Sequence, residues 1–144
     1  MKKITQIAFA FILILVLASC KNTKQKIQEH VSNYNISTSI KGGGIVGTSA
    51  KAFLDDNKIE IRIETNLKGD EESISAAKTS FPDLLKDMIK NNQISQELIE
   101  EGVKFDVYFL AYDNTILAQQ LVDKEEMAIL EGSGGGNGKE TAKL

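Results

Sequence analysis

A strict alternation of isoleucine and charged side chains limits the fold of this 144-residue chain more than any other feature. The six residues concerned are Ile59, Glu60, Ile61, Arg62, Ile63 and Glu64. Because successive side chains of a strand point to opposite faces of the sheet, the pattern predicts a strand with one apolar and one charged face. The turn-forming sequence at residues 55–57 precedes it, so residues 48–54 are expected to form the partner strand of a hairpin.

A second alternation covers residues 103–112. Its apolar positions are Val103, Phe105, Val107, Phe109 and Ala111. Asp113 and Asn114 follow, and both residue types tolerate positive φ, so we expect a tight two-residue turn into a strand over residues 115–122. The sequence therefore predicts a second hairpin.

Helical spacing of apolar residues is found between the two hairpins. The residues are Ala77, Phe81, Leu84, Leu85, Met88 and Ile89. Because proline is tolerated in the first turn of a helix, Pro82 places the expected start of this helix near Ser80, and its end is expected near Asn91. Shorter helices are expected over residues 95–101 and 123–130 from their capping residues.

These elements together predict an α+β fold. The expected architecture is a small antiparallel sheet of two hairpins, in the order β-β-α-β-β, with the helices packed on one face and the other face in contact with water. A short helix that includes Ile27, Val31 and Tyr34 is a further candidate. The domain is expected to span residues 27–131 and to be followed by a flexible glycine-rich tail at residues 132–144.

The first 20 residues have the organisation of an export signal. Lys2 and Lys3 precede an apolar run at residues 7–17, and small residues follow it. The run is shorter than the roughly 20 apolar residues that a membrane span needs. Residues 1–19 are therefore expected to be a signal peptide that is removed.

The tetrapeptide Leu17-Ala18-Ser19-Cys20 resembles the lipobox of bacterial lipoproteins. The resemblance implies that Cys20 carries acyl chains such as palmitate, becomes the first residue after cleavage, and attaches the protein to a membrane through a polar tether at residues 20–26. Lys21 stands where an aspartate retains some lipoproteins at the inner membrane. The resemblance thus favours the outer membrane, with either a periplasmic or a surface orientation.

Charge and composition exclude several classes of protein. Removal of Lys2 and Lys3 changes the net charge from −3 to −5, which opposes binding to nucleic acid. A single cysteine cannot form a disulfide within the chain. No cofactor or partner nucleic acid is expected.

The residues that could carry chemistry do not form a catalytic or metal-binding pattern. The glycines of residues 42–47 have the spacing of a nucleotide-binding loop, but only a short segment separates them from the strand at residue 59, which leaves no room for a crossover helix. His30 is the only histidine, so zinc ligation of the usual kind is not expected, and no serine has a nucleophile signature. Acidic clusters at residues 70–72, 97–101 and 125–126 are expected to be solvated helix ends. We therefore expect no catalytic residues and no metal site.

A candidate interaction patch remains on the second hairpin. If the alternating apolar residues face the helices, then the other side chains point outward near Arg62, and these are Tyr108, Leu110 and Tyr112. Exposed aromatic side chains beside charges are typical of protein-binding surfaces, although loops or residues 27–40 could equally cover them. The sequence therefore favours a non-catalytic, lipid-anchored interaction module of the periplasm. A surface lipoprotein that binds a host or environmental ligand and a small hydrolase are the alternatives.

Overall fold

The computed structural model describes residues 23–40, 42 and 44–133. The expected signal peptide, Cys20 and residues 134–144 of the tail lie outside the described residues. Among the residues described, no helix is both long enough and apolar enough to cross a membrane.

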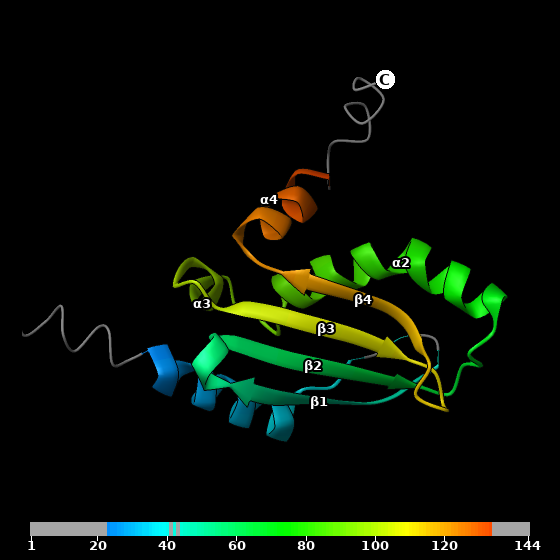
Figure 1. Cartoon of the computed structure of the whole chain (residues 1–144), viewed down its shortest axis with the longest axis horizontal. Helices are drawn as coiled ribbons and strands as arrows, with labels where there is room; N and C mark the ends of the chain where they lie inside the picture. Colours follow the sequence, from blue (N-terminus) through cyan, green and yellow to red (C-terminus); the bar gives the residue numbers. More distant parts are fainter. Residues whose placement is uncertain (1–22, 41, 43, 134–144) are drawn as a thin grey trace, which may run out of the picture.

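The described chain contains a four-stranded sheet with helices before, between and after its strands (Figure 1). An N-terminal helix covers residues 23–37. It is followed by β1 (Ile45–Phe53), η1 (Leu54–Asp56), β2 (Lys58–Thr65), α2 (Glu71–Lys90), α3 (Gln96–Glu100), β3 (Lys104–Leu110), β4 (Ile116–Val122) and α4 (Lys124–Ser133). The α+β class is confirmed, but the order β-β-α-β-β is not matched, because the N-terminal helix, α3 and α4 add to it.

The sheet is mixed, which corrects the expected antiparallel arrangement. Its strand order is β1-β2-β3-β4, and both expected hairpins pair antiparallel. However, β2 and β3 pair in parallel, with Ile59 opposite Phe105 and Ile63 opposite Phe109. The connection through α2 and α3 returns the chain to the end of the sheet at which β2 starts. Strand β3 therefore runs in the same direction as β2.

The connection between β3 and β4 is longer than the expected two-residue turn. The strands end and begin at Leu110 and Ile116, and the Ala111 N–H donates a hydrogen bond to the Thr115 carbonyl at 2.9 Å. Asn114 has a φ of 69°, and the Asp113 carboxylate accepts a hydrogen bond from the Thr115 N–H. Asp113 and Asn114 thus form a turn as predicted, but within a wider loop.

Helix α2 starts well before the position that Pro82 suggested. Asp70 caps it by accepting a hydrogen bond from the Ser73 N–H, and Pro82 lies inside the helix. The Ser80 hydroxyl donates to the Ala76 carbonyl at 3.1 Å instead of capping a helix start. Burial of Phe81 and Leu85, which are 5% and 1% exposed, offsets the backbone hydrogen bond that proline cannot make.

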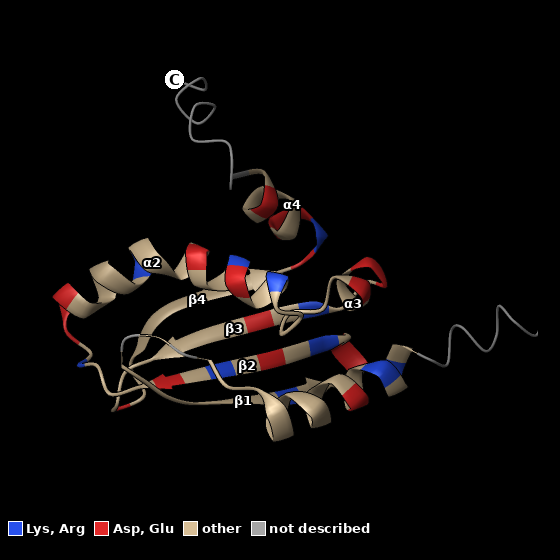
Figure 2. Cartoon of the chain, turned by 180° about the vertical axis from the view of Figure 1, so that it is seen from behind, with Lys and Arg blue, Asp and Glu red and all other residues tan. Residues whose placement is uncertain are grey.

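The helices cover one face of the sheet, as the alternation predicted. Phe81 of α2 packs on Phe109 with ring centroids 6.0 Å apart, and His30 of the N-terminal helix packs edge-on against Phe105 at 5.5 Å. In Figures 1 and 2, α2 runs along β4 and the N-terminal helix runs along β1. None of the described helices covers the face that carries Arg62 and Tyr108, and we call it the open face.

Candidate functional site

Arg62 and Tyr108 are neighbours on the open face. They are directly opposite each other in the β2–β3 pairing, and the Arg62 guanidinium lies 5.9 Å from the centroid of the Tyr108 ring. Arg62 Nη1 also lies 3.7 Å from Glu60 Oε1. The stacking and the ion pair hold a half-exposed guanidinium in one place on a rigid strand.

A buried carboxylate fixes the neighbouring side chains of this face. Asp106 is only 7% exposed, and it accepts hydrogen bonds from the Tyr108 hydroxyl at 3.1 Å and from Gln119 Nε2 at 3.0 Å. Burial and the adjacent Asp106 raise the pKa of Tyr108. The Asp106 network thus connects β3 with β4 on the open face.

The structure separates the four residues of the candidate interaction patch. Leu110 is 1% exposed, so the expectation that it points into solvent is wrong. Tyr112 is 68% exposed and lies beyond the end of β3, where its N–H donates to the Leu67 carbonyl. The β2–β3 register continues without a break to the pair Glu64–Leu110, and the extra residue of the β3–β4 pairing is Leu117 of β4. Leu110 thus lies on the same face as Tyr108 but is covered there. Arg62 and Tyr108 therefore form one site, and Tyr112 lies at the end of the sheet.

His30 has a structural environment. Its Nε2 lies 3.0 Å from the Gln93 carbonyl oxygen, and burial lowers its pKa. No hydrogen bond joins His30 to a serine among the residues described, and the Ser37 hydroxyl donates to the Asn33 carbonyl. Nε2 of His30 is thus engaged with the backbone between α2 and α3.

The glycine-rich segment leads into a strand. Gly44 has a φ of 82°, and Gly47 belongs to β1. A nucleotide-binding loop has to open a helix whose N-terminus meets the phosphates, so this segment does not provide that site. Within residues 23–40, 42 and 44–133, no group of three or more His, Cys, Asp or Glu side chains has the geometry to hold a metal ion.

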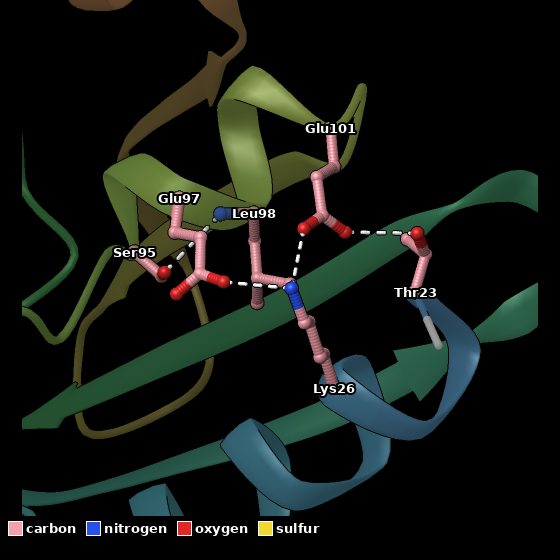
Figure 3. A network of polar contacts seen from close by, with 6 residues as sticks. All are labelled: Thr23, Lys26, Ser95, Glu97, Leu98 and Glu101. Carbon is pink, nitrogen blue, oxygen red and sulfur yellow. Dashed lines mark hydrogen bonds and ion pairs between the residues drawn. The ribbon is translucent and has the colours of Figure 1, made fainter. Parts of the chain in front are cut away.

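Figure 3 shows a second polar site, between the N-terminal helix and α3. Lys26 Nζ lies 2.7 Å from Glu97 Oε1 and 2.6 Å from Glu101 Oε1, and the Thr23 hydroxyl donates to Glu101 Oε2 at 2.8 Å. These hydrogen bonds raise the pKa of Lys26 and lower the pKa of Glu101. Residues 23–26 were expected to belong to a tether, but they form the first turn of a helix that is bonded to the domain.

The comparisons with known proteins identify the fold only. No protein-family model matches the chain, and no curated protein matches it in sequence. A solved structure of a Pseudomonas aeruginosa protein that is thought to be secreted is 14% identical, with a TM-score of 0.57 over 73% of this chain and 92% of that one. The type II secretion system pilotin AspS of Vibrio cholerae is 16% identical, with a TM-score of 0.53 over 74% of this chain and 93% of that one. The chain is similar in fold to both.

Proposed function

We propose that this protein is a lipid-anchored, non-catalytic binding module of the bacterial envelope. Acyl chains on Cys20 attach it to the outer membrane, and its domain binds another envelope protein in the periplasm. The partner contacts the open face at Arg62 and Tyr108.

The arrangement of the open face is the observation that carries this proposal. Arginine and tyrosine are enriched among the residues that dominate the energy of protein interfaces. Here both side chains are held by neighbours, Arg62 by stacking and Tyr108 by Asp106, so little conformational entropy is lost when a partner binds. The likeness in fold to a secretion-system pilotin and to a protein thought to be secreted supports a role outside the cytoplasm.

A change at Cys20 tests the anchor. The variant Cys20→Ala has no thiol to acylate, so we expect it to leave the membrane fraction or to keep its signal peptide, which electrophoretic mobility and fractionation would show. In a cell with two membranes, Lys21→Asp should remain lipidated but move to the inner-membrane fraction. Unchanged fractionation and mobility of Cys20→Ala would contradict the lipoprotein assignment.

Cross-linking in the native envelope tests the binding face. Arg62→Ala/Tyr108→Ala should lose partners that the wild-type protein captures, because both contacts come from side chains of the open face. Lys51→Ala is the matched control, since Lys51 is an exposed cation on the same face at the edge strand β1. Identical partner profiles of the double variant and the control would exclude the Arg62–Tyr108 site.

A further inference from the structure

The sheet has two ends with different surroundings. At one end, β3 begins directly after α3, and α3 holds the first turn of the N-terminal helix through Lys26 and Thr23. We call this the α3 end. At the other end, β1 starts, β2 and β3 stop and β4 starts, as the pairs Ile45–Thr65 and Leu110–Ile116 show. We call this the distal end (Figure 1).

The distal end is a single rigid surface made from three segments that are far apart in the sequence. They are residues 44–46, 66–69 and 112–116. The Asn66 N–H donates to the Gly44 carbonyl at 2.8 Å, and the Tyr112 N–H donates to the Leu67 carbonyl at 2.9 Å. Gly69 packs so closely on Thr115 that a Cβ atom at this position would lie 2.6 Å from the Thr115 hydroxyl oxygen. These contacts preorganise the loops, which reduces the entropy cost of binding.

Exposed apolar side chains lie at both sides of this end, Val46 on the edge strand β1 and Tyr112 and Ile116 at the β3–β4 connection. Tyr112 is 68% exposed, Val46 65% and Ile116 49%, and these are three of the six large apolar residues that are exposed in the described part of the chain. Large apolar side chains that project from a rigid surface are typical of protein contacts.

The charges around these apolar residues are mostly acidic. Among the described residues in or beside the three segments, the exposed acidic ones are Glu64, Asp70, Glu71, Glu72 and Asp113, and the exposed cation is Lys68. Figure 2 shows acidic residues in red at the start of α2. The hydrogen bond from the Ser73 N–H lowers the pKa of Asp70, and hydrogen bonds from the side chain and the N–H of Thr115 lower the pKa of Asp113, so both carboxylates are ionised at neutral pH. A complementary partner has to present positive charge beside apolar side chains.

We propose that the distal end docks a segment of another envelope protein in which Lys or Arg residues flank apolar side chains. This inference rests on the proposed function, because it takes the partner class and the Cys20 anchor from it. Only Lys21 and Asn22 separate Cys20 from Thr23, and the three Cα–Cα steps span at most about 11 Å, so the anchor holds the α3 end beside the bilayer. The distal end then faces away from the membrane, toward proteins of the periplasm.

Site-specific photocross-linking in cells that produce the full chain tests this docking site. A photoreactive amino acid at position 112 should cross-link to a protein segment that contains Lys or Arg beside apolar residues, identified by mass spectrometry. The same amino acid at position 129 of α4 is the matched control, because Ile129 is similarly exposed at 61%. We expect at least a fivefold higher cross-linking yield from position 112 than from position 129.

Charge variants test the electrostatic part of the proposal. Glu71→Gln/Glu72→Gln should reduce the yield from position 112 several-fold, since it removes two acidic groups of the distal end. Glu100→Gln/Glu125→Gln removes the same charge elsewhere and should leave the yield unchanged. A synthetic peptide of the cross-linked segment should bind the purified domain more weakly as salt concentration rises.

The outcomes separate this inference from the proposed function. Cross-linking of a protein only from position 108, or from position 112 to an acidic segment, would overturn the distal-end site and leave the proposed function in place. Cross-linking only from position 129 would overturn the distal-end site and also the open face as the binding surface. Cross-linking of lipid from position 112 would overturn the orientation. If positions 108, 112 and 129 all capture no protein, both proposals fail.

Discussion

The two faces of the central strands differ in what fixes their side chains. On the helix-covered face, Ile61 and Phe105 are fully buried and are held by packing. On the open face, one residue further along each strand, Arg62 and Asp106 are held by stacking and hydrogen bonds. Packing of apolar side chains supplies most of the stability of a fold, whereas polar contacts at a surface contribute little. The helix-covered face therefore carries most of the stability, and the open face is the surface for which we propose recognition.

The largest expected effect is the difference in stability lost when a residue of each face of β2 is replaced by alanine. Ile61→Ala should lower the free energy of unfolding by about 3 kcal/mol, because it leaves a cavity between the sheet and the helices. Arg62→Ala, at the next position of the same strand, should lower it by less than about 1 kcal/mol. Urea denaturation measures both, and similar losses would contradict the division between the faces.

A smaller effect concerns pH and the helix-covered face. In the unfolded chain His30 binds a proton near its ordinary pKa of about 6.5, whereas burial lowers its pKa in the folded protein. The unfolded chain thus binds more protons in the window below pH about 6.5, so the free energy of unfolding should fall as pH falls through that window. Between pH 7 and pH 5, the free energy of unfolding measured by urea denaturation should fall less in His30→Gln than in the wild-type protein.

The acidic groups do not interfere with this measurement. The pKa values of Asp70, Glu101 and Asp113 are lowered from ordinary values near 4, so their contributions are lost at more acidic pH. If the free energy of unfolding depends on pH equally in the wild-type protein and in His30→Gln, burial does not lower the pKa of His30.

The smallest effect concerns the open face and leaves the core unchanged. Asp106→Asn removes a negative charge beside the Tyr108 hydroxyl, so the pKa of Tyr108 should fall toward its ordinary value. Ultraviolet absorbance measured against pH would detect this fall. Tyr34 is the internal control, because its burial against the sheet raises its pKa to about 12, away from Asp106. If the pKa of Tyr108 does not change in Asp106→Asn, Asp106 does not raise the pKa of the Tyr108 hydroxyl.

Local patterns in the sequence predicted most of the individual elements. The alternations at residues 59–64 and 103–109 gave strands with the expected buried faces, and Ser95 and Asp123 cap the short helices. These signals are local, since a strand or a cap is determined by residues at most a few positions apart. The placement of Arg62 beside Tyr108 on the outer face also followed from side-chain alternation.

Contacts between distant residues could not be predicted in this way. Helix α2 continues through Pro82 beside the buried Phe81, and Leu110 is buried although the alternation of β3 places it on the face of Tyr108. The Asp106 network needs β3 and β4 together, because Gln119 comes from the neighbouring strand. Local periodicity does not contain this information.

The sequence by itself determined that the chain has two hairpins, helices on one sheet face, and a lipobox-like Cys20 at its start. Only the tertiary structure decided that β2 and β3 run in parallel, that Lys26 joins the N-terminal helix to α3, and that Val46, Tyr112 and Ile116 share one end of the sheet. The physical reason is distance along the chain. Side-chain periodicity sets which face of an element is buried, but the packing of the whole domain selects which elements become neighbours.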